Sequence, residues 1–170
     1  IGRSAFYSCT KLSKIDFPST LTEIDAYAFY GCSSLTKVVL PQSVKRLGEN
    51  AFSRCSGLTS VSVGNGAVAL GARAFYECAL LSEVSLGSSL VSVGESAFYG
   101  CTSLTRLILP NRLVSLGDSA FYGCASLTAA ALPAGVESIG SYAFRKCTAL
   151  TGIFLGNELR SVGSYAFQDC

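Results

Sequence analysis

Cysteine is the residue type in this sequence that could build a metal or redox site. Eight cysteines occur, and neighbouring ones are always 23 residues apart: Cys9, Cys32, Cys55, Cys78, Cys101, Cys124, Cys147 and Cys170. Zinc sites use closely spaced pairs such as C-x2-C, often with histidine among the ligands. The chain has no histidine. We therefore expect no bound metal and no cofactor.

Disulfide bonds are the other chemistry open to eight cysteines. If the 23-residue units stack as coils, equivalent Cα atoms would lie about 4.8 Å apart, a separation that a disulfide tolerates. Side chains in such a column run parallel, however, so their Cβ atoms would lie farther apart than the ~3.8 Å of a disulfide. We expect eight reduced, buried thiols that pack as small apolar side chains.

Catalytic groups are sparse in the rest of the chain. There is no histidine to act as a general base, no motif pairs two carboxylates, and no serine stands in a nucleophile-elbow context. The glycines follow the repeat and do not form G-x-G-x-x-G. We therefore expect that the protein is not an enzyme.

The net charge of the chain and the length of its apolar runs limit the classes of partner that we expect. The chain has 13 basic and 11 acidic residues, a net charge of +2, which is too balanced to favour nucleic acid or an anionic membrane surface. No apolar run approaches the roughly 20 residues of a membrane span. We therefore expect no nucleic-acid partner and no membrane insertion.

The repeat that carries the cysteines extends through the whole chain. Phenylalanine recurs every 23 residues from Phe6 to Phe167, always after alanine and always three residues before a cysteine. Such a fixed period is typical of a solenoid, in which each repeat forms one coil stacked on the last. The sequence predicts a single array over residues 1–170, with seven repeats and a partial one. It starts and ends inside a repeat, as expected of a fragment or a processed product.

Three apolar positions in each repeat, spaced L-x-x-L-x-L, predict a strand. The first set is Leu12, Ile15 and Phe17, and its last two positions alternate with variable residues, as in a strand with one buried face. Each strand ends at proline or glycine, and a second apolar pair predicts a narrower strand ladder. Glycine then recurs, as at Gly48 and Gly94, and is expected to turn the chain. We expect seven strands in one parallel sheet.

The block around each Ala-Phe pair has helical spacing. Ala28, Phe29, Cys32 and Leu35 are three or four residues apart, which would place them on one helical face. Acidic or hydroxyl residues before the pair suit the first turn of a helix. Glycines such as Gly31 limit the helix to about two turns. We expect a short helix in each coil, opposite the sheet.

The L-x-x-L-x-L motif followed by a turn resembles the leucine-rich repeat. The 23-residue unit with the pattern IG..AF..C..L is similar to the BspA-type branch of that family over residues 1–170. The resemblance implies an α/β solenoid: a right-handed coil with a parallel β-sheet on one face and short helices on the other. It also implies a cell-surface or extracellular protein of bacteria or protists, used in adhesion to host or matrix proteins. The sequence lacks an asparagine ladder after the strand, and terminal caps are missing.

The outward-facing strand residues are the candidates for a binding site. In the second half of the array these positions are apolar, and exposed apolar patches with an aromatic anchor often mark interaction sites. The residues predicted to bind a protein partner are Ile108, Ala131, Phe154, Arg106, Val39 and Lys37. Adhesion or protein recognition through this strand face is the function that we expect.

Other interpretations stay open. Flanking sequence could cover the apolar patch. The array could also be a structural scaffold that self-associates end to end, because solenoids need polar caps and the last coil presents Leu159, Val162 and Phe167 uncovered. A column of tyrosines, which includes Tyr76 and Tyr99, could bind carbohydrate or protein, although covering the junctions between coils is the simpler role.

Overall fold

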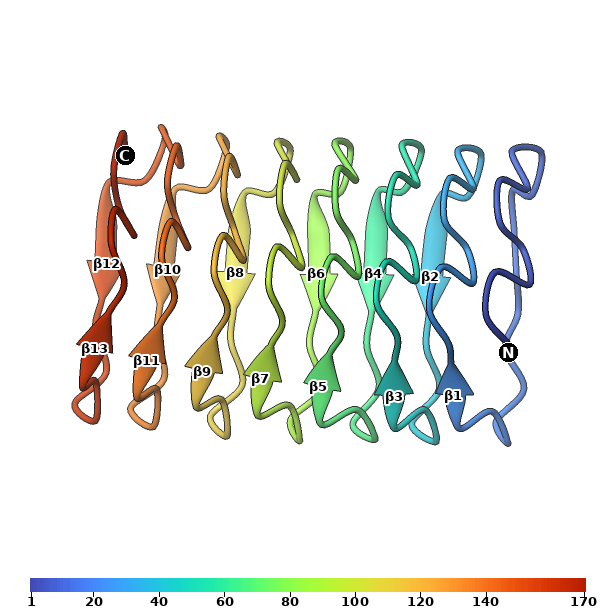
Figure 1. Ribbon diagram of the computed structural model, residues 1–170, viewed down its shortest axis with the longest axis horizontal. Helices are drawn as coiled ribbons and strands as arrows, with labels where there is room; N and C mark the ends of the chain where they lie inside the picture. The colour runs from blue at the N-terminus through green and yellow to red at the C-terminus, as the bar shows by residue number, and fades with distance from the viewer.

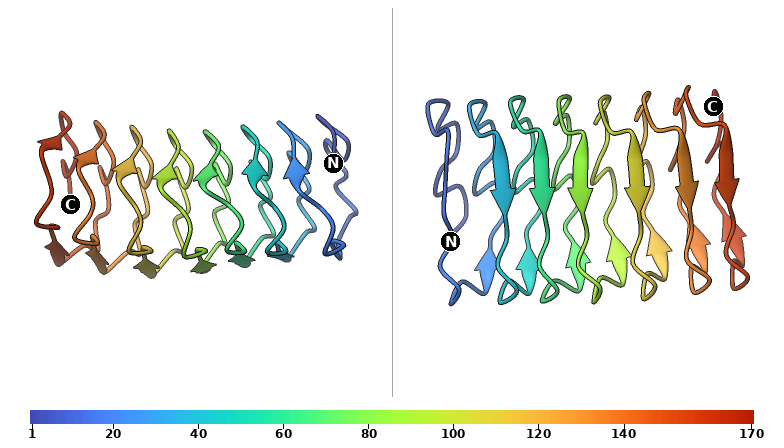
Figure 2. Two further views of the ribbon diagram at one scale, coloured as in Figure 1. Left: turned by 90° about the horizontal axis from the view of Figure 1, so that it is seen from below. Right: turned by 180° about the vertical axis from the view of Figure 1, so that it is seen from behind.

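The computed structural model describes residues 1–170 as one elongated solenoid of stacked coils (Figure 1). The N- and C-termini lie at opposite ends of the array, and strands occupy two of its sides (Figure 2). Only 11 of the 102 backbone hydrogen bonds lie within strands. The rest lie in turns and loops. Stacked turns therefore make most of the backbone hydrogen bonds, both within a coil and between neighbouring coils.

Two ladders of parallel strands run along the solenoid. The strands predicted from L-x-x-L-x-L are β2 (Lys37–Val39), β4 (Ser60–Ser62), β6 (Glu83–Ser85), β8 (Arg106–Ile108), β10 (Ala129–Ala131) and β12 (Gly152–Phe154). The narrower ladder consists of β1 (Glu23–Ile24), β3 (Arg46–Leu47), β5 (Ala69–Leu70), β7 (Ser92–Val93), β9 (Ser115–Leu116), β11 (Ser138–Ile139) and β13 (Ser161–Val162). Paired residues are 23 positions apart, so the repeat sets the register, and the predicted second ladder is confirmed.

The wide strands do not form the single seven-stranded sheet that the sequence predicts. They form two three-stranded sheets, β2-β4-β6 and β8-β10-β12, and the segment from Leu12 to Phe17 in the first coil forms no strand. The seven-stranded sheet is the narrow one, which runs without a break from β1 to β13. We refer to the unpaired junction between β6 and β8 as the seam (Figure 1).

The seam also interrupts a ladder of side-chain hydrogen bonds. Thr59 Oγ1 donates to the carbonyl oxygen of Thr36 at 3.0 Å, and equivalent bonds join the coils on both sides of the seam. The bond from Thr105 to Ser82 is absent. At the seam the inward residue changes from Val84 to the longer Leu107, and Val84 is only half-buried, whereas Leu107 is buried. The larger change from Leu107 to Ala130 leaves β8 and β10 paired, so this difference in side-chain length alone does not account for the break.

The block predicted as a helix forms stacked turns, so the expected short helices are wrong. Tyr27 and Gly31 have φ values of 58° and 71°, and the left-handed conformation stops a right-handed helix. The N–H of Tyr30 donates within its coil to Tyr27, but the N–H of Phe29 donates to Ala51 of the next coil at 2.8 Å. A helix would direct every N–H four residues back in its own segment. The chain contains no helix long and apolar enough to cross a membrane.

The core consists of parallel columns of residues that occupy the same position in successive coils. One cluster of 42 buried side chains runs along the solenoid. Within it, successive phenylalanine rings stack with centroids 4.8–5.7 Å apart and planes within 15° of parallel. The predicted phenylalanine column is thus confirmed, and its ring spacing follows from the repeat of the coil.

The cysteines form a second column of free thiols. From Cys32 onward, each Sγ donates to the carbonyl oxygen of the phenylalanine in the preceding coil, at 3.1–3.4 Å. Six cysteines are buried, but Cys9 is half-buried and Cys170 is exposed. Burial raises the pKa of the Cys78 thiol to about 12. The expected burial is confirmed for the six inner thiols and is wrong for Cys170, which is exposed.

Two of the eight thiols are expected to react quickly with a thiol reagent in the native protein. Cys9 and Cys170 lie in the end coils and meet solvent, whereas the inner six are shielded and stay protonated because burial raises their pKa. A colorimetric thiol titration should count two fast groups before denaturation and eight after it. Eight fast native thiols, or four disulfides by mass spectrometry, would contradict this picture.

Candidate functional site

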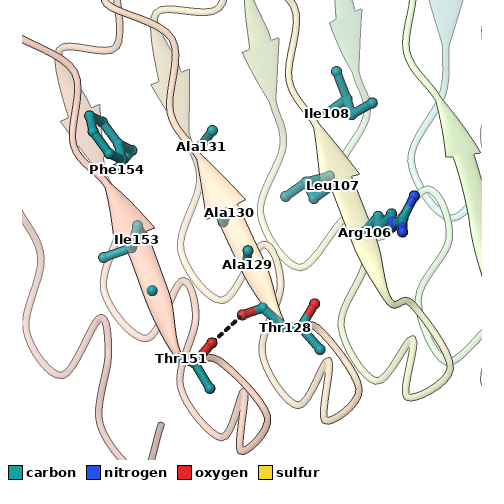
Figure 3. Close-up of a pocket in the computed structure, with 11 residues that line it drawn as sticks. Arg106, Leu107, Ile108, Thr128, Ala129, Ala130, Ala131, Thr151, Ile153 and Phe154 are labelled. Atoms are coloured by element: carbon teal, nitrogen blue, oxygen red, sulfur yellow. Dashed lines mark hydrogen bonds between the residues drawn. The ribbon is translucent and has the colours of Figure 1, made fainter.

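Four of the six residues predicted to bind a partner line one hollow on the strand face. Arg106 and Ile108 belong to β8, Ala131 to β10 and Phe154 to β12 (Figure 3). The hollow has a volume of about 620 Å³. We call it the trough. It lies entirely on the second three-stranded sheet, from the seam to the last wide strand.

Strand alternation places these four side chains outward. The middle residue of each strand points into the solenoid: Leu107 and Ala130 are buried, and Ile153 is half-buried. The residues on either side are exposed, as expected for a period of two. The outward register predicted from the sequence is therefore confirmed in all three strands.

The upper row of the trough is an apolar slot. Ala131 is in register with Ile108 on one side and with Phe154 on the other, and both of these large side chains are 80% exposed. They form two walls, and the methyl group of Ala131 forms the floor (Figure 3). Two strand spacings separate the walls by about 10 Å between backbones, which leaves room for one inserted side chain.

The lower row of the trough is open, and Arg106 stands at its seam edge with its guanidinium directed away from Ala129 (Figure 3). Arg106, Ala129 and Gly152 share one register, and a Cβ placed on Gly152 would meet no atom within 4 Å. Arg106 is the only charged residue that lines the trough. At the lower end, Thr151 Oγ1 donates to the carbonyl oxygen of Thr128 at 3.2 Å (Figure 3), so this hydroxyl is already used between coils.

The guanidinium of Arg106 has no carboxylate partner in the chain. Glu83 holds the equivalent outward position on β6, yet none of the eight ion pairs joins it to Arg106 across the seam. By contrast, Arg73 pairs with Glu95 of the next coil at 2.8 Å. The seam was not predicted from the sequence.

The other two predicted residues, Lys37 and Val39, lie on β2, beyond the seam from the trough. They line a separate and more polar hollow, whose other residues include Ser60, Ser62 and Glu83. Arg106 and Ile108 also reach that hollow. Val39 is half exposed, and the large exposed apolar side chain that shares this hollow with it is Ile108. Lys37 and Val39 therefore adjoin the trough through the shared Arg106 and Ile108 but do not line it.

The tyrosine column lies on the turn side of the solenoid. The rings of Tyr76, Tyr99 and Tyr122 stack with centroids 4.6–4.9 Å apart, and the cationic groups of Arg145 and Lys146 lie over the ring of Tyr122. Ring faces that cover one another are closed to a sugar or a peptide, which would need a free face for stacking. This geometry favours the role of covering the junctions between coils.

The comparisons with known proteins agree on the architecture. A family model described as "BspA type Leucine rich repeat region (6 copies)" matches residues 1–82 and 68–170. The comparison with curated proteins gives no match. Solved structures do match this chain, and three of them differ in their identity to it and in the share of each chain that aligns.

A leucine-rich repeat protein of T. pallidum has 26% identity and a TM-score of 0.62, over 75% of this chain and 72% of that one. The pneumococcal vaccine antigen PcpA has 25% identity and a TM-score of 0.63, over 99% of this chain and 52% of that one. A leucine-rich cell surface protein of Faecalibacterium prausnitzii has 23% identity and a TM-score of 0.57, over 90% and 68%. The chain thus spans about half the length of the pneumococcal protein.

The family match covers the same residues as the Ala-Phe-x-x-Cys repeat, and the repeat has a clear structural role. Its phenylalanines and cysteines form the buried columns, and its strands pair at a spacing of 23 residues. The resemblance inferred from the sequence is confirmed. On this evidence the chain belongs to the BspA-type leucine-rich repeat family.

Proposed function

We propose that this chain is a protein-recognition module that binds its partner through the strand face. The observation that carries the proposal is the pair of walls of the trough, Ile108 and Phe154, which are 80% exposed and have no role in the core. Burying a large apolar side chain stabilises a complex by about 1.5–3 kcal/mol. Members of this repeat family are typically non-enzymatic binding modules, which supports the same function.

We place this module in a cell-surface or extracellular protein, where it would act in adhesion to host or matrix proteins. The pneumococcal protein that aligns with nearly all of this chain is described as a vaccine antigen. That description supports a surface location here. It also makes a panel of purified extracellular-matrix proteins the natural set of probes.

The double variant Ile108→Ser/Phe154→Ser is expected to weaken binding to a matrix protein by about 2 kcal/mol or more, which is roughly 30-fold in Kd. Both walls of the trough are removed, while the buried columns stay intact. Biolayer interferometry with the matrix panel provides the measurement. The matched control is Val68→Ser/Leu80→Ser, which removes two half-exposed apolar side chains away from the trough and should leave Kd within about threefold.

Two results would count against this proposal in different ways. If circular dichroism shows that the Ile108→Ser/Phe154→Ser variant is unfolded, the outward register is wrong. If the variant is folded and binds its matrix protein with unchanged Kd, the trough is not the binding site.

The alternative function is a structural scaffold that stacks end to end. Each coil of a solenoid contacts only its neighbours, so the coils of two arrays would stack in the same way. Stacking would use the end coils and leave the trough free. Sedimentation at increasing concentration separates the two functions, because a strict monomer that still binds a matrix protein excludes the scaffold.

A further inference from the structure

We propose that the trough binds a protein segment in which one apolar or aromatic side chain stands next to a carboxylate. This inference rests on the proposed function and adds the chemistry of the partner. The upper row of the trough would take the apolar side chain, and the lower row would bring the carboxylate to Arg106.

The upper row selects an apolar group. Its surface consists of the side chains of Ile108, Ala131 and Phe154, none of which can donate or accept a hydrogen bond. A polar side chain inserted there would lose its water without gaining a partner, which is unfavourable. A large aliphatic or aromatic side chain would instead bury area on two walls and a floor at once, and the ring of Phe154 adds a stacking surface.

The lower row selects a negative charge. Arg106 is the sole charged residue of the trough and forms no ion pair with Glu83 or any other carboxylate of the chain. Its guanidinium lies at the seam edge of the trough, on the side of β8 away from Ala129 (Figure 3), and a carboxylate of a partner would approach it there. A guanidinium presents a planar fork of donors that fits a carboxylate with two parallel hydrogen bonds. A lysine or arginine of a partner would be repelled at the same place.

The distance between the two rows fixes the spacing within the partner. Arg106 and Ile108 are two residues apart on β8, which is about 6.7 Å along an extended strand. An aspartate or glutamate one or two residues from the apolar side chain spans that distance. The partner motif is therefore an apolar or aromatic residue with an acidic residue at the next position or the one after it.

A second copy of this chain fits the trough poorly. A two-fold dimer through this face would bring the same patch of both subunits together, so both Arg106 side chains would enter one small interface, and the outward carboxylate of the neighbouring strand, Glu83, lies outside the trough. The charge of the trough thus favours a different protein with an acidic segment.

Selection from a random peptide library displayed on phage tests the inference. Panning on the wild-type protein should enrich peptides with an aromatic or large aliphatic residue next to aspartate or glutamate. Panning on Arg106→Glu should enrich lysine or arginine at that acidic position and keep the apolar one. A synthetic copy of a wild-type peptide should bind Arg106→Glu at least about tenfold more weakly, because a charge-assisted hydrogen bond is lost.

Two further variants make the result specific. Gly152→Val fills the open lower row, where an added side chain meets no atom of the protein, and should also weaken the peptide. Arg112→Glu makes the same charge change at an exposed arginine outside the trough and should not. An equal loss with Arg112→Glu would overturn the inference, because it would indicate a general charge effect.

The outcomes distinguish a failure of this inference from a failure of the proposed recognition function. Peptides that lose binding to Ile108→Ser/Phe154→Ser but show no acidic preference would leave the recognition function standing and overturn the chemistry proposed for the partner. If no selected peptide depends on Ile108 and Phe154, both the function of the trough and its proposed partner are overturned.

Discussion

Replacing Phe98 with alanine is expected to destabilise the protein by about 3–5 kcal/mol. Phe98 is fully buried, and its ring stacks between Phe75 and Phe121 with centroids 5.3 Å away on each side. Removing the middle ring opens a cavity between two aromatic faces. The coils cannot close it, because their spacing is fixed by the turn hydrogen bonds, such as that from the N–H of Phe98 to Ala120.

Urea denaturation followed by circular dichroism measures the loss of free energy of unfolding. The control is Phe154→Ala, the same chemical change at an exposed position, which should alter stability by no more than about 0.5 kcal/mol. A comparable loss in both variants would show that the stacked column does not hold the coils together. It would also undermine the claim that Phe154 has no role in the core.

The parts of the fold that follow from the period could be predicted from the sequence. Residues 23 positions apart must occupy equivalent places in successive coils, so the column of Phe75, Phe98 and Phe121, its neighbouring thiols and the strand register needed no further information. The same reasoning placed Ile108 and Phe154 outward, where the structure has them. That these two residues bind a partner stays a prediction.

The conformation of the turns could not be predicted in this way. Spacings of three and four residues, as among Ala28, Cys32 and Leu35, bury one side of a helix and one side of stacked turns equally well. The choice between them depends on hydrogen bonds to the next coil, such as that from Phe29 to Ala51, which the pattern of a single repeat does not contain. Thirteen residues other than glycine, Tyr27 among them, adopt positive φ. The positions of the glycines therefore did not indicate which residues take the left-handed conformation.

The position of the seam could not be predicted from the sequence either, and the seam borders the candidate binding site. It lies between two repeats that share the same pattern of apolar positions, so nothing in that pattern marks where the wide strands stop pairing. Glu83 of β6 and Arg106 of β8 line one hollow across the seam, but no ion pair joins the two side chains. Arg106 is thus unpaired at the seam edge of the apolar slot, and this combination is what gives the trough a chemical preference.

Gly94→Val is expected to destabilise the protein by about 3 kcal/mol or more, since overpacking a tight site forces the backbone to move. The sequence suggests that this glycine is needed to turn the chain, but its φ is not positive. The structure gives another reason. A Cβ placed on Gly94 would lie 2.7 Å from the carbonyl oxygen of Leu70 and 2.8 Å from the backbone nitrogen of Ala72. Both atoms belong to the backbone of the preceding coil, so neither can swing away.

Gly152→Val is the matched control, because it adds the same atoms where nothing lies within 4 Å. Gly152 is the first residue of β12, and valine suits a strand better than glycine does, so this variant should gain up to about 1 kcal/mol. Urea denaturation of the two variants measures the contrast. Equal losses would show that close approach of the coils is not what requires glycine at Gly94. A loss confined to Gly94→Val would establish that the backbones there set the coil spacing, and through it the distance between the Ile108 and Phe154 walls of the trough.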